Sequence, residues 1–550
     1  MKILFVMKNT GLYERQGIMQ LSSIVKQHGH STKLLLTEDL SEEECAEELH
    51  EYEPQILAYS VMTGEHNYHI ELNHALKKHY NFLSVFGGPH PTYVPDMIEK
   101  VGVDAVCQGE GDLVFLDLVE RMSAGKDYYD IPNFWFKKPN GDIVRNDIGP
   151  LIEDLDTLPF PDRELMYEAD PALAAKGDKQ FMAMRGCPYL CTYCFNHAYN
   201  KMMKGLGKIY KSRSVDLMVE EINQVREKYR VDLVDFCDDT FLARRFEWLE
   251  EASVKFPKEV GLPIRVNLRA DLLSKEKYSE VLRKMGVKVV TMAAECGNNE
   301  IATKILKRNM SNEAILEAAR NLRKNKIKLI SQNLIGLPVD NPLEVDFETL
   351  DFNIQIKPFF AWSSILYPYP QTEIGQLAID KGMFQADYDN IQVSNKTSTS
   401  LDFGNEMLKR RLVNLHKLFP IIVQFPVLRP VTIFLISLPL EKLYTWLFFA
   451  FYGIKMVFQT KFSTMVKTSG HYLKFFIKYV SCLESRRLFA KKKPIKLFYP
   501  KPPSATSEKK AGGGTQNGTN DEMANTGILI TVKPYQITAV KNSKSRLTIS

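Results

Sequence analysis

The stretch Met184-Arg185-Gly186-Cys187-Pro188-Tyr189-Leu190-Cys191-Thr192-Tyr193-Cys194 decides how the rest of the chain is interpreted. Its three cysteines follow the pattern C-x3-C-x2-C. Thiolates bind iron strongly, and a cubane cluster needs four ligands. Three local cysteines can hold three irons and leave the fourth open to a substrate, much as a catalytic zinc site keeps an open position. The pattern therefore predicts a redox-active 4Fe-4S cluster held by Cys187, Cys191 and Cys194.

Zinc is the main alternative for three clustered cysteines. Zinc sites usually combine two C-x2-C or Cys/His pairs, and no second pair is present in the sequence. His197 is the nearest candidate for a fourth ligand. Scattered cysteines in a long chain are usually buried thiols, and that is the expectation for the other five, at positions 45, 107, 237, 296 and 482.

The bulk composition limits the classes of protein to which the chain can belong. Its 550 residues are 45% hydrophobic, which is enough for two or three domains with separate cores. The net charge of +5 is small and spread along the chain, so nucleic acid is not expected as a partner. The apolar run at residues 1–7 is followed at once by Lys8 and is too short for a secretory signal. We therefore expect a cytoplasmic protein, with association with a membrane left open.

Residues 1–130 alternate strand and helix patterns. Such alternation is typical of a parallel, doubly wound sheet of the Rossmann-like kind. Ligands of these sheets bind beyond the carboxyl ends of the strands. Four loops fall at those ends, at residues 10–17, 62–66, 87–92 and 109–112. The sequence therefore predicts an N-terminal ligand-binding domain.

A second series of strands and helices occupies residues 177–395. Its six expected strands are 180–184, 233–237, 265–268, 288–292, 328–333 and 360–365. Six such units predict a complete or partial (β/α)6 barrel, with the cysteine loop after its first strand. The fold class is therefore α/β, a doubly wound sheet followed by a barrel.

Composition marks three further segments. Residues 131–176 are expected to connect the two α/β parts, with a hairpin at Asn140-Gly141 and extended chain near Pro159 and Pro161. Residues 396–495 are expected to form a helical C-terminal region. Residues 496–550, rich in Pro, Ser, Lys and Gly at their start, are expected to be a disordered tail.

The cysteine motif, with aromatic Tyr193 before its last cysteine, resembles that of the radical S-adenosylmethionine (radical SAM) superfamily. The resemblance implies that the open iron binds the amino and carboxylate groups of S-adenosylmethionine (SAM). It also implies that one electron cleaves the sulfonium to methionine and a 5′-deoxyadenosyl radical. A low-potential cluster is required, and iron–sulfur potentials extend to about −700 mV. The resemblance implies an external electron donor, a flavodoxin or a ferredoxin, and a place for Tyr193 near SAM.

Residues at the ends of the other barrel strands resemble SAM-binding positions of this superfamily. Asp238 and Asp239 resemble the segment that holds the methionine amino group, with helix capping as the alternative role. Glu295 resembles an acidic position near the ribose or amino acid, and Arg308 an arginine that pairs with the methionine carboxylate. Solvated surface positions are the alternative for both. Gly336 resembles the glycine beside which adenine binds, with a plain turn as the alternative.

The N-terminal domain resembles that of the cobalamin-binding class of radical SAM proteins. The specific match is Gly87-Gly88-Pro89-His90-Pro91-Thr92, followed by Gly109-Glu110-Gly111-Asp112. The resemblance covers residues 1–395 and implies cobalamin as a cofactor beside the cluster and SAM. The cobalamin-binding residues that it implies are Ser60, Thr63, Gly87, Gly88, His90, Thr92, Gly109 and Glu110.

The sequence departs from one motif of cobalamin domains. Many of them carry D-x-H-x-x-G, whose histidine ligates cobalt from below, and this chain has no such motif. Radical SAM members commonly lack it as well. We therefore expect the lower face of cobalt to be free or capped by another residue. His90 is expected to be a loop or core histidine and not a metal ligand.

The resemblance implies methylation of an unactivated carbon in a small or lipid-like substrate. Cobalamin-dependent cyclisation, oxidation or rearrangement is the alternative within the class. Methylthiotransferases use three further N-terminal cysteines, and two cysteines, Cys45 and Cys107, precede the motif here. A ferredoxin-like electron-transfer or sensor protein would carry four ligands per cluster, and three are present.

The C-terminal region carries two apolar stretches, residues 431–440 and 443–454, separated by Glu441-Lys442. Neither reaches the roughly 20 residues needed to span a bilayer, and Pro439 interrupts the first. We expect the region to contact a membrane surface or a lipid-like substrate without crossing the bilayer. A helical subdomain packed on the barrel is the alternative.

Overall fold

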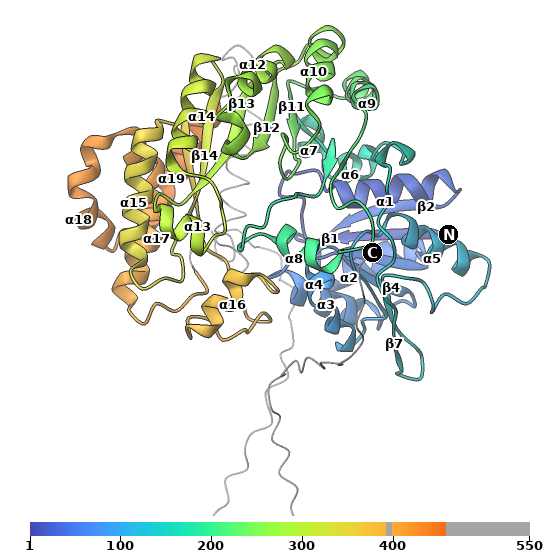
Figure 1. The fold of residues 1–550 in the computed structure, drawn as a ribbon. Coiled ribbons are helices and arrows are strands. Elements are labelled where there is room, and N and C mark those ends of the chain that lie inside the picture. The colour runs from blue at the N-terminus through green and yellow to red at the C-terminus, as the bar shows by residue number, and fades with distance from the viewer. Residues whose placement is uncertain (392–398, 458–550) are drawn as a thin grey trace, which may run out of the picture. The chain divides into compact units, whose positions relative to one another are not determined.

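The N-terminal part of the chain is a seven-stranded sheet with the order β2-β1-β3-β4-β5-β6-β7 (Figure 1). The structure, a computed structural model, describes residues 1–391 and 399–457. Strands β1 to β5 pair in parallel, and β6 and β7 form an antiparallel edge. The strands are β1 Lys2–Met7, β2 Ser31–Leu36, β3 Ile56–Ser60, β4 Leu83–Gly87, β5 Ala105–Cys107, β6 Phe134–Lys137 and β7 Ile143–Arg145.

Helices cover both faces of this sheet. Side chains of a strand alternate between its two faces, so Phe5 of β1 joins one core and Val6 the other. The helices α1 (Gln16–Gln27) and α5 (Asp112–Ser123) pack on the first face, and α2 (Glu42–Tyr52) and α3 (His66–Leu76) on the second. The expected doubly wound sheet is confirmed.

The segment expected to be a connector is partly absorbed into the first sheet. The Asn140-Gly141 turn joins β6 to β7, and Gly141 has a φ of +91°. Phe134 and Phe136 of β6 are buried against the sheet, so the sheet continues to Arg145. After the sheet come a short 3-10 helix, η2 (Leu155–Thr157), and two short α-helices, α6 (Arg163–Ala169) and α7 (Pro171–Ala175). Asp162 and Asp170 begin these two helices by accepting backbone N–H groups.

The second sheet is the expected partial barrel. Its six strands are parallel in the order β15-β14-β13-β12-β11-β8, and within the described residues no pairing joins β8 to β15. The strands are β8 Asp178–Phe181, β11 Leu233–Phe236, β12 Ile264–Leu268, β13 Val287–Glu295, β14 Lys328–Ile335 and β15 Phe360–Ile365. The main helices between them are α8 Phe195–Met202, α9 Val215–Lys228, α10 Phe246–Lys255, α12 Glu276–Met285, α14 Asn312–Lys324 and α15 Pro342–Ile356.

The first barrel strand is shorter than its sequence indicates. The expected strand at 180–184 divides into β8 and the two-residue β9 (Met184–Arg185), which pairs antiparallel with β10 (Lys211–Ser212). The Asp238 carboxylate causes the change, because it accepts the N–H groups of Ala183 and Met184 at 2.8 and 3.0 Å. The chain therefore leaves the sheet just before the cysteine loop.

Four described helices follow β15, and two of them, Glu406–Gln424 and Glu441–Val457, pack against this edge of the barrel. The four are α16 Glu373–Asp380, α17 Glu406–Gln424, α18 Thr432–Ser437 and α19 Glu441–Val457, with the 3-10 turn η4 Pro426–Val431 before α18. Asn414 of α17 donates to the carbonyls of Ile436 and Leu438 at 2.9 and 3.1 Å. Pro439 lies between α18 and α19, where the two apolar stretches are expected to separate. None of the described helices has the length and hydropathy to span a bilayer. The expected tail at 496–550 lies outside the described residues.

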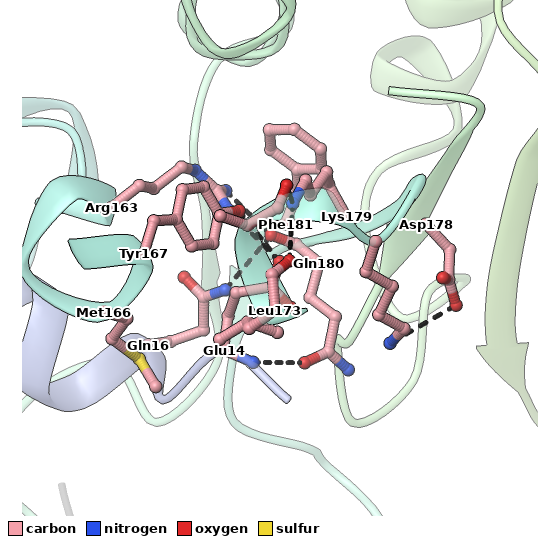
Figure 2. Close-up of polar contacts among 12 residues, drawn as sticks. Glu14, Gln16, Arg163, Met166, Tyr167, Leu173, Asp178, Lys179, Gln180 and Phe181 are labelled. Carbon is pink, nitrogen blue, oxygen red and sulfur yellow. Dashed lines mark hydrogen bonds and ion pairs between the residues drawn. The ribbon is translucent and has the colours of Figure 1, made fainter. Parts of the chain in front are cut away.

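A buried group of charged side chains joins the first sheet to the barrel (Figure 2). Arg163, the first residue of α6, pairs with Glu221 of α9 at 3.0 Å and lies 3.9 Å from Glu14 in the loop after β1. The Tyr167 hydroxyl donates to Glu14 at 2.9 Å. Burial alone would lower the pKa of Arg163, but Tyr167, Glu221 and Glu14 raise it overall, so the guanidinium stays charged.

Arg163 also fixes the edge strand of the barrel. Its Nη2 donates to the Gln180 carbonyl at 2.7 Å, and Gln16 donates to the same carbonyl at 3.2 Å. The Gln180 side chain accepts the Glu14 N–H at 3.2 Å. The loop after β1 is thereby held against β8 by contacts from three parts of the chain.

Replacing Arg163 by alanine should destabilise the protein strongly. The change leaves the Glu14 carboxylate, whose side chain is 0% exposed, without its ion-pair partner, and leaves Glu221, which is 3% exposed, with Arg213 as its remaining partner. Removing one partner of a buried ion pair typically costs about 3–5 kcal/mol. We expect a large fall in the urea midpoint, followed by circular dichroism.

Arg121→Ala is the matched control for this change. Arg121 also pairs with two carboxylates, those of Asp117 and Asp130, but at the surface. Exposed pairs contribute little to stability, so its midpoint should stay near that of the wild type. Equal effects of the two substitutions would contradict the role given to Arg163.

Candidate functional site

The cysteine loop lies between β9 and α8. Gly186 opens it with a φ of +79°, and a Cβ on this residue would collide with the carbonyl oxygen of Ile209. Cys187 and Cys191 are buried, and Cys194 is the N-terminal cap of α8. Glycine is therefore needed at 186 for the chain to turn from β9 into the loop.

The three thiols lie close enough to affect one another. Burial raises the pKa of Cys187 to about 12 and that of Cys194 to about 11, and Asp239 and the neighbouring cysteines add to both shifts. In residues 1–391 and 399–457 no three His, Cys, Asp or Glu side chains already converge as a metal site. Three thiols on one loop are nevertheless the donor set that an iron–sulfur cluster requires.

His197 is not positioned as a fourth ligand of the cluster. It lies in α8, and its Nε2 pairs with Glu373 of α16 at 2.7 Å. Lys201 and Lys307 bind the same carboxylate. The imidazole therefore joins α8 to α16.

Tyr193, Glu295 and Arg308 form one buried group beside the cysteine loop. The Tyr193 hydroxyl donates to Glu295 at 3.0 Å and accepts from Arg308 at 2.6 Å. Arg308 also donates to the Ala293 carbonyl at 2.6 Å and is 2% exposed. The terminal N–H groups of Arg308 are thus hydrogen-bonded to Tyr193 and to the Ala293 carbonyl. Glu295 ends β13 with a φ of +64°, an uncommon conformation for glutamate.

Asp238 and Asp239 have different environments. Asp238 is fully enclosed by the N–H groups that split the first strand and by Arg244, with which it forms an ion pair. Asp239 borders a cavity, and burial raises the pKa of its carboxyl group, while Asn196 lowers it by hydrogen bonding. Of the two aspartates, Asp239 is the one whose carboxylate is available to a ligand.

Gly336 follows the fifth barrel strand with a φ of +71°. Its N–H donates to the buried carboxylate of Asp346 at 3.0 Å. A Cβ on residue 336 would lie 3.4 Å from the Phe403 ring. The turn is therefore fixed by Asp346 and closely packed.

A cavity of about 350 Å³ lies where the carboxyl ends of the first sheet meet the start of the barrel. From the first sheet, the residues lining it include Ser60, Gly87, Gly88, Gly109 and Glu110, and from the barrel Met184, Arg185, Gly186 and Asp239. A Cβ on Gly17, which also lines the cavity, would meet no atom within 4 Å. Gly87, Gly88 and Gly109 of the glycine turns thus line the same cavity as the residues that lead into the cysteine loop.

Thr92 joins the two glycine turns. Its hydroxyl donates to the Gly88 carbonyl at 2.8 Å and accepts the Gly109 N–H at 3.1 Å. Gly88 has a φ of +98°, and a Cβ there would lie 3.0 Å from the Val61 nitrogen. Thr92 itself does not line the cavity, so it shapes the turns from behind.

His90 is a core histidine, as expected. It is 2% exposed, stacks on His66 with ring centroids 3.9 Å apart, and its Nδ1 lies 3.2 Å from the Thr63 hydroxyl. Burial lowers the pKa of His90 to about 3, which keeps the ring neutral. Thr63 and His90 support the loop after β3, and neither lines the cavity.

Arg185 links the glycine turn at 109–112 to the cysteine loop. Its two terminal nitrogens donate to Asp112 at 2.8 and 2.9 Å, a bidentate pair. Glu110 lies 3.7 Å from Arg185 and pairs with Lys211 of β10 at 2.9 Å. Arg185 directly precedes the loop, but no local sequence pattern distinguishes it, because its partner Asp112 is far away in the chain.

Two family models match the chain, "B12 binding domain" over residues 5–119 and "Radical SAM superfamily" over residues 182–349. They coincide with the glycine-lined sheet and with the barrel that carries the cysteine loop. This chain is a cobalamin-binding radical SAM protein. The cofactors expected from the sequence, a 4Fe-4S cluster, SAM and cobalamin, are confirmed by the same matches.

Curated relatives of this radical SAM protein align with most of its length. The uncharacterized methyltransferase PH0819 of Pyrococcus horikoshii is 26% identical over 374 residues, 66% of this chain and 78% of the relative. The anaerobic magnesium-protoporphyrin IX monomethyl ester cyclase of Rubrivivax gelatinosus is 24% identical over 442 residues, 76% of this chain and 77% of the relative.

Solved structures share the fold. The radical SAM methyltransferase TsrM from Kitasatospora setae is 18% identical to this chain. The match covers 69% of this chain and 76% of the TsrM chain, with a TM-score of 0.57. The cobalamin-dependent radical enzyme OxsB is 13% identical. The match covers 88% of this chain and 79% of the OxsB chain, with a TM-score of 0.57.

Gly88→Ala should weaken cobalamin binding. The new Cβ would press on the Val61 backbone and on the Ser60 hydroxyl, at 3.0 to 3.3 Å, and so displace the cavity wall. We expect the dissociation constant for hydroxocobalamin, measured by absorbance titration, to rise about tenfold or more, which corresponds to about 1.4 kcal/mol.

Gly141→Ala is the control for backbone strain. Gly141 has a similar φ of +91°, but a Cβ there meets no atom within 4 Å and lies in the β6–β7 turn. It should bind cobalamin as the wild type does. Unchanged binding by Gly88→Ala would exclude this turn from the cobalamin site.

Proposed function

We propose that this protein is a cobalamin-dependent methyltransferase that methylates an unactivated carbon of a small or lipid-like substrate. The observation that carries the proposal is a shared cavity, which is bordered by the glycine turns and also by the residues that lead into the cysteine loop. The bidentate Arg185–Asp112 pair holds these two walls together. Cofactors bound on the two walls would face a common space.

The groups bound there supply complementary chemistry, because the cluster and SAM provide a 5′-deoxyadenosyl radical and cobalamin provides a methyl group. Cys187, Cys191 and Cys194 would hold the cluster. The Asp239 carboxylate, which lines the cavity and is exposed to it, is suited to the SAM ammonium group, since opposite charges attract. Arg308 would act by holding Tyr193 in position.

On the cobalamin side, the proposed contacts are the cavity-lining residues Ser60, Gly87, Gly88, Gly109 and Glu110. Thr63, His90 and Thr92 would act by supporting them. His90 is not expected to be a ligand of cobalt, because it is stacked on His66 and buried. A flavodoxin or ferredoxin is the proposed electron donor, and the cytoplasm is the proposed location of the reaction.

A cobalamin-dependent radical cyclase is the second candidate. It is favoured by the relative from Rubrivivax gelatinosus, a cyclase by name, whose similarity covers 76% of this chain. The two candidates share the cluster, SAM and cobalamin, and differ in whether a methyl group leaves SAM.

The products formed from SAM distinguish these candidates. With dithionite, cobalamin and SAM, the anaerobic protein should release 5′-deoxyadenosine, and Cys191→Ala should release none because the cluster has lost a ligand. A methyltransferase that draws its methyl group from SAM also forms S-adenosylhomocysteine, whereas a cyclase forms 5′-deoxyadenosine alone. Liquid chromatography with mass detection measures both. Absence of 5′-deoxyadenosine from the wild type would refute radical catalysis.

We also propose that the C-terminal helices rest on an anionic membrane surface. Leu443, Trp446 and Ile454 of α19 are exposed at helical spacing, by 47%, 62% and 56%. The adjoining α18, to which Tyr444 is hydrogen-bonded through the Leu435 carbonyl, exposes Phe434 by 63%. An exposed apolar face with aromatic residues is typical of interfacial helices.

The charge of the following sequence favours an anionic surface. Lys455, Lys461, Lys467 and Lys474 occur within twenty residues that contain no Asp or Glu. Each basic residue near an anionic membrane contributes about 1 kcal/mol. A membrane location would bring a lipid-like substrate to the enzyme.

Vesicle flotation tests this proposal. The full chain should float with vesicles of phosphatidylcholine and phosphatidylglycerol, and less with phosphatidylcholine alone. Leu443→Glu/Trp446→Glu should stay at the bottom of the gradient, because it places carboxylates on the exposed face. Val254→Glu, at a 53% exposed position on α10, should float as the wild type does. Failure of the wild type to float would favour a helical subdomain that only packs on the barrel.

A further inference from the structure

Arg269 makes a contact with the cysteine loop that the proposed function leaves unused. It directly follows β12, and its Nη1 donates to the Cys191 sulfur at 3.1 Å. Both residues are buried, at 9% and 7% exposure. The guanidinium lies over the Tyr189 ring, 3.8 Å from its centroid. A charged donor is thus aimed at a ligand sulfur from a fixed, stacked position.

The charge of Arg269 is balanced in part by a long ion pair with Asp271. The nearest carboxylate, Asp271, lies 3.6 Å from the Arg269 Nε, beyond hydrogen-bond distance. That Nε is buried and has no hydrogen-bond partner. Arg308, by contrast, is bound by Tyr193, Glu295 and the Ala293 carbonyl. Of these two arginines, Arg269 is the one that contacts a cysteine sulfur.

Hydrogen bonds to ligand sulfurs and nearby charge are main determinants of an iron–sulfur reduction potential. Accepting an electron adds one negative charge to the cluster. A buried cation beside a ligand sulfur stabilises that charge, and the low local dielectric strengthens the effect. The potential therefore rises when such a donor is present.

We propose that Arg269 is a positioning residue that raises the reduction potential of the cluster through its hydrogen bond to Cys191. The step on which it acts is the one-electron reduction of the cluster from the 2+ to the 1+ state. A flavodoxin or ferredoxin loses that electron, and no covalent bond or proton changes place. The role rests on the cluster-binding part of the proposed function and not on methyl transfer.

The experiment is a redox titration of the reconstituted full chain without cobalamin, SAM or substrate, followed by electron paramagnetic resonance. Arg269→Gln removes the charge and should make reduction at least tenfold less favourable, a midpoint about 59 mV more negative for a one-electron couple. Arg269→Lys keeps the charge but not the planar donor, so its midpoint potential should fall between those of the wild type and Arg269→Gln. Iron content should match that of the wild type.

Arg226→Gln is the matched control. Arg226 of α9 donates to the Val260 carbonyl at 2.6 Å and contacts no cysteine, so its loss should leave the midpoint unchanged. A wild-type midpoint in Arg269→Gln with full iron content would overturn the proposal. If Arg269→Gln loses iron, Arg269→Lys decides, since a lowered midpoint supports the role and an unchanged one refutes it. Because no SAM is present, the result is independent of whether methyl transfer occurs.

Discussion

The burial of Arg163 between Glu14 and Glu221 is the constraint on which the arrangement of the two sheets depends. Each carboxylate belongs to a different α/β part, and the guanidinium comes from the segment between them. A buried charge requires its partners to be present. The three segments must therefore fold together for Glu14 and Arg163 to be fully paired, whereas Glu221 also pairs with Arg213 of its own part of the chain. The first loop of the first sheet is thereby fixed against the barrel edge.

From this constraint follows the position of the cofactor walls. Parallel strands of each sheet direct their carboxyl ends to one edge, where ligands bind. Holding the loop after β1 against β8 brings these edges to opposite sides of one cavity. Asp238 then turns the chain out of the barrel sheet, and Arg185 binds Asp112 across the gap. The shared cavity results from these pairings and not from either fold alone.

Much of this could be predicted from sequence, because the decisive signals are local. The three cysteines, the glycine turns and the strand–helix alternation each lie within a short stretch, and they identified both domains and all three cofactors. The split of the first barrel strand and the roles of Arg185 and Arg269 could not be predicted. Each depends on a partner far away in the chain, such as Asp238, Asp112 or Cys191. The neighbouring aspartates 238 and 239 look equivalent in sequence, but Asp238 is enclosed by two backbone N–H groups and Arg244, whereas Asp239 borders the cavity.

The shared guanidinium at position 163 also bears on how such a protein can be recombined. Glu14, Arg163 and Glu221 are spread over more than two hundred residues, so the natural unit of exchange is longer than the cobalamin domain. A graft that replaced residues 1–130 by a segment without a carboxylate at position 14 would leave the buried Arg163 with Glu221 as its ion-pair partner. The N-terminal domain is thereby coupled to the connector and to the first strand–helix unit of the barrel, which carries Glu221, although the sheet and the barrel match separate family models.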